Sequence, residues 1–111
     1  MYFETIRPED IFRKQNNQRG ILVDVRDCEA YQCGHIPGAI NIPYEELRNR
    51  VPFLRERVSQ MSDKSKPAVV IVYCDRGNTS LRAAIDLTRQ GFWVKNVYGG
   101  IKNYHGPLTS D

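Results

Sequence analysis

The sequence has no long apolar segment and no strong excess of charge of either sign. Its longest apolar run, Ala68–Cys74, is far shorter than the roughly 20 residues that a membrane-spanning helix requires. The net charge is +3 over 111 residues, and the basic residues form no long run. These absences argue against a membrane-embedded protein and against a nucleic-acid-binding one, and they allow only a weak attraction for small anions.

Cysteine is scarce as well, and its 3 copies are an odd number. Cys28 and Cys33 do not have the spacing of metal ligands, and the histidines add no ligand pattern, so the sequence predicts no metal site. The first residues show no basic segment followed by an apolar one, so we expect no secretory leader. An odd number of thiols without a leader favours a reducing, cytoplasmic location.

The chain does contain apolar, strand-like runs that alternate with segments of helical periodicity. The expected strands are residues 2–6, 21–25, 39–42, 68–73 and 92–98. Such an alternation in 111 residues predicts a single domain, residues 1–111, of the α/β class. Its sheet should be mainly parallel, with helices on both faces.

Helices are expected between these strands. Pro8, with acidic residues directly after it, predicts a helix that lasts to about Gln15. Pro52 interrupts an apolar face of helical spacing, so we expect two short helices or a kink, with Pro52 near the start of the second segment. That apolar face consists of Leu47, Val51, Leu54 and Val58.

The segments around the last helix and strand carry further expectations. A stripe of Leu81, Ala84, Ile85 and Thr88 is expected to face the core. The polar segment 59–67 is expected to be an exposed connection. The aromatic residues Phe92, Trp93 and Tyr98 are expected in the core or at the sheet edge.

Cys74 stands where an apolar strand ends and a polar loop leads into a helix. The carboxyl end of a parallel strand is where α/β sheets place their sites, and the positive N-terminus of a helix favours a thiolate. A free cysteine is often only a small core residue, which is the alternative interpretation. The polar residues 75–78 that follow are unsuited to a core, so the position favours a reactive cysteine.

The loop after Cys74 has a composition suited to holding an anion. If the six residues 74–79 curl around the sulfur, their backbone N–H groups form a nest of donors, and Gly77 permits the necessary backbone conformation. This arrangement predicts nucleophilic attack by sulfur and a covalent intermediate whose negative charge lies among those donors. The candidate binding residues are Asp75, Arg76, Gly77, Asn78, Thr79 and Ser80. We hypothesise that Arg76 assists anionic substrates; the alternative is that it simply faces solvent.

Four segments, in order, resemble the signatures of the rhodanese family of sulfurtransferases. They are Asp24-Val25-Arg26 with Glu29-Ala30-Tyr31, the stretch 34–43 (Gly-His-Ile-Pro-Gly-Ala-Ile-Asn-Ile-Pro), the stretch from Val72-Tyr73-Cys74 to Ala84, and Val97-Tyr98-Gly99-Gly100 with Tyr104. The family commonly has tryptophan where this chain has Tyr104. The resemblance spans roughly residues 6–108, which is nearly the whole chain.

The resemblance implies a parallel five-stranded α/β domain and a sulfurtransferase reaction. Cys74 would take sulfane sulfur from a donor such as thiosulfate, another thiosulfonate or a persulfide, and carry it as a persulfide. The acceptor would be cyanide in an assay, and a thiol or a protein in the cell. The ring of N–H donors would stabilise the terminal sulfur without a metal or an organic cofactor.

Loop length separates this chain from the related phosphatases and arsenate reductases of the same fold. Those proteins have an arginine six residues after the cysteine, and this chain has Ser80 there, with Arg82 two positions too late. Bidentate recognition of phosphate therefore lacks its guanidinium, which argues against a phosphatase. Many small rhodaneses have arginine where this chain has Thr79, a departure that leaves the identity of the donor open.

Other polar residues of the signatures are expected to be structural. Arg26 is expected to bind carboxylates or carbonyls at the end of its strand, together with Asp24. His35 is expected to pin its loop by a hydrogen bond, and we expect no general base there. Cys33 could alternatively resolve an oxidised or persulfidated Cys74. A rhodanese-fold binding or regulatory module, in which Cys74 no longer turns over a donor, is the alternative to an enzyme.

Overall fold

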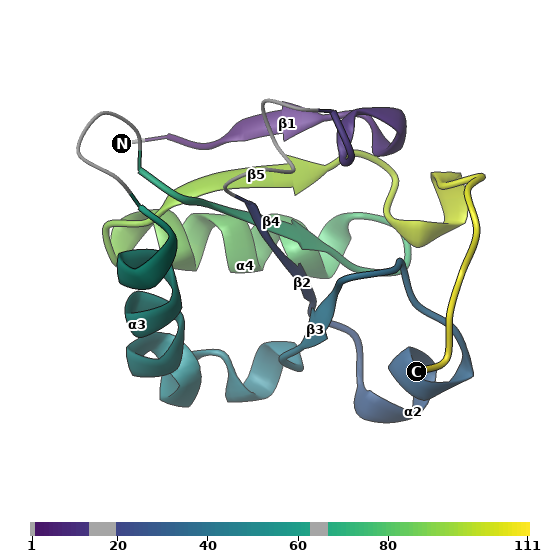
Figure 1. The fold of residues 1–111 in the computed structure, drawn as a ribbon, viewed down its shortest axis with the longest axis horizontal. Helices are drawn as coiled ribbons and strands as arrows, with labels where there is room; N and C mark the ends of the chain where they lie inside the picture. Colours follow the sequence, from purple (N-terminus) through teal and green to yellow (C-terminus); the bar gives the residue numbers. More distant parts are fainter. Residues whose placement is uncertain (1, 14–19, 63–66) are drawn as a thin grey trace.

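The protein forms a five-stranded sheet in which every strand pair is parallel (Figure 1). The computed structural model describes residues 2–13, 20–62 and 67–111. The strands are β1 (Glu4–Ile6), β2 (Gly20–Asp24), β3 (Ile40–Asn41), β4 (Val69–Tyr73) and β5 (Trp93–Val97). Their order is β1-β5-β4-β2-β3, so the strand that leads to Cys74 is central. The predicted α/β class with a parallel sheet is confirmed.

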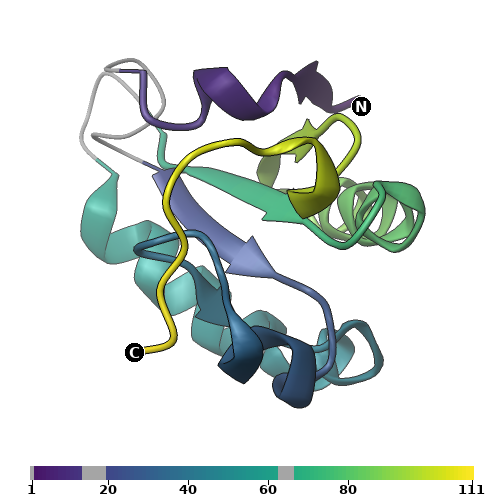
Figure 2. The ribbon, with the colours of Figure 1, turned by 90° about the vertical axis from the view of Figure 1, so that its right-hand side faces the viewer.

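Helical segments cover both faces of the sheet. The helices α3 (Val51–Met61) and α4 (Asn78–Arg89) pack on one face, where Leu54 and Leu87 join the core. The other face is covered by the 3₁₀ turns η1 (Pro8–Asp10) and η4 (Ile101–Asn103) and by the region of α2 (Cys28–Cys33). The C-terminal segment, yellow in Figure 2, runs from η4 past the sheet and pairs with His35 through Thr109.

The two faces explain why the central strands are apolar throughout. On β4, Val70 and Val72 pack with the α3 and α4 side, whereas Ile71 and Tyr73 pack with the opposite side. Successive side chains of a strand point to opposite faces, so a strand covered on both faces shows no polar alternation. This burial fixes the position of Cys74, the residue that follows β4.

The expected division of the helix near Pro52 is confirmed. Two 3₁₀ turns, η2 (Tyr44–Glu46) and η3 (Arg48–Arg50), precede α3, and Pro52 lies in the first turn of α3. Proline is tolerated in a first turn because the missing N–H has no partner within the helix there. The structure extends α3 to Met61, so the expected connection from residue 59 begins too early; residues 63–66 lie outside the described residues.

The expected buried stripe of α4 is right for Ala84 and Thr88, which are buried, and wrong for its two large residues. Leu81 and Ile85 are 42% and 37% exposed. The buried residues of α4 are Ser80, Ala83, Ala84, Leu87 and Thr88. The buried face thus shares Ala84 and Thr88 with the expected stripe but continues to Ala83 and Leu87, and most of its side chains are small, which lets the helix approach the sheet closely. Large apolar residues therefore shifted the expected face to one side of the observed one.

Two further expectations need correction. Trp93 and Tyr98 are 66% and 65% exposed, so only Phe92 of the three aromatic residues lies in the core. The helix expected from Pro8 is a 3₁₀ turn that ends at Asp10. The described chain then continues as turns and a bend through residue 13. Its expected end near Gln15 lies outside the described residues.

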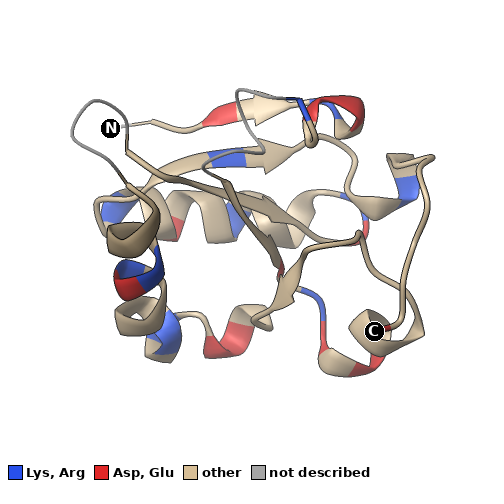
Figure 3. Ribbon diagram, in the orientation of Figure 1, with Lys and Arg blue, Asp and Glu red and all other residues tan. Residues whose placement is uncertain are grey.

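Charged residues are distributed over the whole fold. Figure 3 shows Lys and Arg interspersed with Asp and Glu along α3 and on other elements around the sheet. Within the described part of the chain, no helix is both long enough and apolar enough to span a bilayer.

Candidate active site

Cys74 lies between the end of β4 and the start of α4, with 5% of its surface exposed. Its sulfur accepts hydrogen bonds from the backbone N–H of Gly77 at 3.1 Å and of Ser80 at 3.2 Å. The hydroxyl oxygen of Ser80 lies 3.4 Å from the same sulfur. The loop thus curls around the sulfur and directs polar groups at it, as an anion nest does.

Gly77 gives the loop its curvature. Its φ of +103° lies in the left-handed region, which glycine adopts without the steric cost that a Cβ brings. This conformation aims the Gly77 N–H at the sulfur, and Gly77 also precedes the first residue of α4. The sequence-based interpretation of Gly77 agrees with this geometry.

A second glycine turn supports the loop from behind. The N–H of Ile101 donates to the carbonyl oxygen of Cys74 at 2.8 Å, and the N–H of Lys102 donates to that of Asp75 at 3.1 Å. Gly100 lies so close that a Cβ there would contact the Cys74 oxygen and come within 2.5 Å of the Asp75 oxygen. The sequence predicted only a turn at Gly99-Gly100, because the residues near a turn do not indicate which distant segment it packs against.

Cys74 opens onto a cleft of about 460 Å³ whose walls carry both signs of charge. The side chains predicted for the site that line it are Arg26, Asp75, Arg76, Asn78 and Thr79, and those that sequence reasoning missed include Asp27, Glu45 and Lys102. Asp75, Arg76, Asn78 and Thr79 are exposed, whereas Ser80 is fully buried beneath the sulfur. Glu45 comes from η2 and Lys102 from η4, so only the fold brings them to Cys74.

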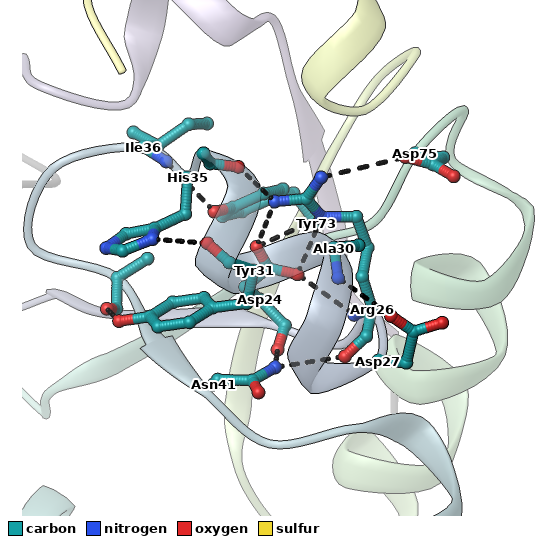
Figure 4. Close-up of polar contacts among 12 residues, drawn as sticks. Asp24, Arg26, Asp27, Ala30, Tyr31, His35, Ile36, Asn41, Tyr73 and Asp75 are labelled. Carbon is teal, nitrogen blue, oxygen red and sulfur yellow. Dashed lines mark hydrogen bonds and ion pairs between the residues drawn. The ribbon is translucent and has the colours of Figure 1, made fainter. Parts of the chain in front are cut away.

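A buried ion pair links the first signature to the Cys74 loop (Figure 4). The Arg26 guanidinium binds the fully buried Asp24 carboxylate, with its closest contact at 2.7 Å, and donates to the Gly34 carbonyl oxygen at 2.7 Å. Another of its nitrogens lies 3.8 Å from the Asp75 carboxylate. Burial alone would lower the pKa of Arg26, but the hydrogen bonds and charge of Asp24 outweigh it and raise that pKa. Arg26 therefore stays charged.

Tyr73 and His35 complete this network on the side away from the cleft. The buried Tyr73 hydroxyl accepts the Ile36 N–H at 3.1 Å, and burial, followed by the charge of Asp24, raises the pKa of Tyr73. His35 is 2% exposed, its Nδ1 lies 2.8 Å from the Tyr31 carbonyl oxygen, and its ring stacks on that of Tyr31. His35 is not among the residues that line the cleft, which agrees with a loop-pinning role.

The remaining cysteines lie apart from the cleft. Cys28 and Cys33 are exposed on α2, and neither lines the cleft of Cys74. Among the described residues, no group of three or more His, Cys, Asp or Glu residues could hold a metal ion.

Loss of the buried carboxylate should destabilise the protein strongly. Asp24→Ala leaves the Arg26 guanidinium, whose side chain is 10% exposed, without its main partner. We expect the free energy of unfolding to fall by about 3 kcal/mol, measured by urea denaturation. In the double variant Asp24→Ala/Arg26→Met no buried charge remains unpaired, so it should lose less stability than the single variant. Equal losses in the two variants would contradict this account of the pair.

The fold and the site together define a class: an α/β domain that holds a thiol at the end of a central parallel strand, inside a loop of hydrogen-bond donors. Comparison with known families agrees with that class. The family model of the rhodanese-like domain matches residues 8–106. The chain belongs to the rhodanese-like domain family.

Solved structures of similar proteins include both single domains and part of a larger chain. A rhodanese-related protein from Thermoplasma volcanium is 26% identical, with a TM-score of 0.71 over 98% of this chain and 100% of that one. A rhodanese with anions from E. coli is 33% identical, with a TM-score of 0.65 over 83% and 99%. CoADR-RHD from Bacillus anthracis is 34% identical, with a TM-score of 0.70 over 92% of this chain but only 16% of that one.

Proposed function

We propose that this protein is a sulfurtransferase that carries sulfane sulfur as a persulfide on Cys74. The observation that carries the proposal is the pair of backbone N–H groups, from Gly77 and Ser80, that point at the Cys74 sulfur. Such fixed donors favour a negative charge at or next to that atom. The similarity to a rhodanese with anions supports the same proposal.

The proposed chemistry needs only the thiolate and the two substrates. The Cys74 thiolate attacks the outer sulfur of thiosulfate, the sulfur–sulfur bond of thiosulfate breaks, and sulfite leaves with the electron pair. Cyanide, a thiol or a protein thiol then attacks the terminal sulfur of the persulfide and restores the Cys74 thiolate. Both steps conserve charge, and the loop donors stabilise the anionic sulfur between them.

The position of Arg82 supports sulfur transfer over phosphate transfer. Arg82 is exposed on α4 and does not line the cleft, whereas the buried Ser80 occupies the place six residues after Cys74. No guanidinium from α4 therefore closes the loop for bidentate binding of phosphate. A single sulfur atom, bound through backbone N–H groups, needs no such guanidinium.

The intact mass of the protein after incubation with thiosulfate tests the proposal. We expect a gain of one sulfur atom that cyanide removes, with release of thiocyanate. Absence of a gain with thiosulfate, a thiosulfonate and a persulfide would contradict it and would point to a binding or regulatory module. A protein that works on small thiols and persulfides in this way would suit the reducing cytoplasm.

Arg76 should assist anionic donors. It lines the cleft and is exposed to water, where a single positive charge near a dianion attracts it by about 1 kcal/mol. We therefore expect Arg76→Ala to raise the KM for thiosulfate about fivefold at low salt, with a smaller effect at high salt. Arg82→Ala, which removes the same charge outside the cleft, is the matched control. An unchanged KM in Arg76→Ala would show that Arg76 simply faces solvent.

A further inference from the structure

A second groove lies directly beside the cleft of Cys74. It encloses about 490 Å³, and Arg76, Asn78 and Lys102 line both it and the cleft. Its other walls include Thr5, Leu81, Asn96, Tyr98 and Asn103. A molecule in the groove therefore lies next to the opening through which the Cys74 sulfur is reached.

Asn96, on β5, gives this groove a polar group that nothing in the fold explains. It is 5% exposed, and its buried Oδ1 has no hydrogen-bond partner among the described residues. A buried acceptor without a partner destabilises a protein, so a donor from outside would be favourable there. The terminal torsion of an asparagine side chain is broad, which allows the carboxamide to turn its oxygen toward the groove.

The strand register places a second polar residue beside Asn96. Asn96 pairs with Thr5 of β1 in parallel register, so their side chains point to the same face of the sheet. Val97, the next residue, packs in the core of the opposite face. Both groove residues thus lie on the α4 side, under Leu81.

Two large, exposed side chains give the groove an apolar part, and its border with the cleft is basic. Leu81 and Tyr98 are 42% and 65% exposed, although both are large and largely apolar. Neither Arg76 nor Lys102 forms an ion pair with a carboxylate within the described ranges. A matching ligand therefore carries an N–H donor, an apolar side chain and a negative charge.

We infer that this groove binds an extended, cysteine-containing segment of an acceptor protein, in which an apolar and an acidic residue lie near the cysteine. The inference rests on the proposed sulfurtransferase function and names the partner of that reaction. A backbone N–H of the segment donates to Asn96, its apolar side chain packs against Leu81 and Tyr98, and its carboxylate faces Arg76 and Lys102. A small thiol has no apolar side chain for those walls, which favours a protein segment.

Sulfur transfer to this segment balances without another reagent. The thiolate of the segment attacks the terminal sulfur of the Cys74 persulfide. The bond between that sulfur and the Cys74 sulfur breaks, and Cys74 leaves as a thiolate with the electron pair. The cysteine of the segment becomes the persulfide. For this reaction, that cysteine must reach the cleft while the rest of the segment lies in the groove.

Synthetic acceptors test the inference. The probe is an acetylated pentapeptide amide with the sequence Gly-Cys-Leu-Asp-Ala, and the controls are the same peptide with Lys in place of Asp and N-acetylcysteine amide. The protein is loaded with thiosulfate, and sulfur transfer to each acceptor is followed by mass spectrometry. We expect the probe to react about 10-fold faster than either control, because it alone has both an apolar and an acidic contact.

Two variants separate the groove from general effects on the fold. Asn96→Val removes the unpaired carboxamide from a strand, so the melting temperature should stay equal or rise. The rate ratio of the probe to N-acetylcysteine amide should nevertheless fall about fivefold, which is the effect of one lost hydrogen bond. Thr88→Val is the matched control, since Thr88 also has a buried oxygen without a partner among the described residues but does not line the groove. It should leave the ratio unchanged.

The outcomes also separate this inference from the proposed function. A serine analogue of the probe, labelled with a fluorophore, measures binding by anisotropy without any sulfur transfer. Weaker binding of this analogue to Asn96→Val than to the unsubstituted protein supports the groove as its binding site. Failure of thiosulfate to leave sulfur on Cys74 would overturn the proposed function but not this binding site. Equal rates for the probe and N-acetylcysteine amide, or equal ratios in Asn96→Val and Thr88→Val, would overturn the inference.

Discussion

Cys74→Ser should abolish both the mass gain after thiosulfate and the release of thiocyanate. A serine hydroxyl is not ionised near neutral pH and is a poor nucleophile toward sulfur, so we expect thiocyanate formation to fall by about 10³-fold or more. The substitution replaces only the sulfur atom, by an oxygen atom of similar size, at a residue that is 5% exposed. The melting temperature should therefore change little, which separates lost chemistry from lost structure.

The other two thiols supply a matched control for this result. Cys28 and Cys33 are exposed on α2, where a persulfide would lack the donors that surround Cys74. The double variant Cys28→Ser/Cys33→Ser should keep the full mass gain and the full rate. A loss of turnover in that variant would support Cys33 as a resolving thiol. A mass gain in Cys74→Ser would show that the sulfur is carried by another residue.

Gly100→Ala should damage both the stability of the fold and the support of the Cys74 loop. Alanine would place a Cβ against the carbonyl oxygens of Cys74 and Asp75, and it would have to adopt a φ of +65°. With its ψ of −160°, this conformation is adopted essentially by glycine alone; for alanine it costs at least about 1 kcal/mol, and the overlap with fixed backbone atoms costs about 2 kcal/mol more. We expect the free energy of unfolding to fall by about 3 kcal/mol, as measured by urea denaturation.

The same substitution should also impair sulfur transfer in the molecules that remain folded. Ile101 and Lys102, which follow Gly100, hold the backbone of Cys74 and Asp75, so a shifted turn would displace the sulfur from its donors. A misplacement of this kind should lower kcat/KM about 10-fold or more. Gly91→Ala is the control, because its φ is +96° but no atom lies within 4 Å of a Cβ there. Equal losses in both variants would show that strain alone, without the contact to the Cys74 loop, explains the effect.

The local part of the site could be predicted from the sequence. The apolar run into Cys74, the loop with Gly77 and the following helix are contiguous, and their conformations depend on residues close in the chain. Ser80 was predicted as part of the loop, and the structure adds that its N–H and hydroxyl both face the sulfur. The parallel sheet could also be predicted, because strands that alternate with helices have few other arrangements.

The face of α4 and the surroundings of the exposed aromatics could not be predicted in this way. The periodicity of α4 suits two adjacent stripes, and only the distance to the sheet selects the one with Ala83 and Leu87 over the one with Leu81 and Ile85. Trp93 is the first residue of β5 and Tyr98 follows its last residue, yet both side chains are exposed. The burial of a side chain depends on which distant segments pack against it, and the local sequence pattern does not indicate those segments.

The sequence by itself determined the class of the domain, the position of Cys74 at the end of a buried strand and the loop that follows it, because strand, loop and helix propensities act over a few residues. Only the tertiary structure decided what surrounds that loop. Gly100 against the Cys74 carbonyl, Arg26 near Asp75, Lys102 at the cleft and the unpaired Asn96 beside it all come from contacts between segments far apart in the chain. Such contacts are fixed by the order and register of the strands, which determine which loops meet at the carboxyl edge of the sheet.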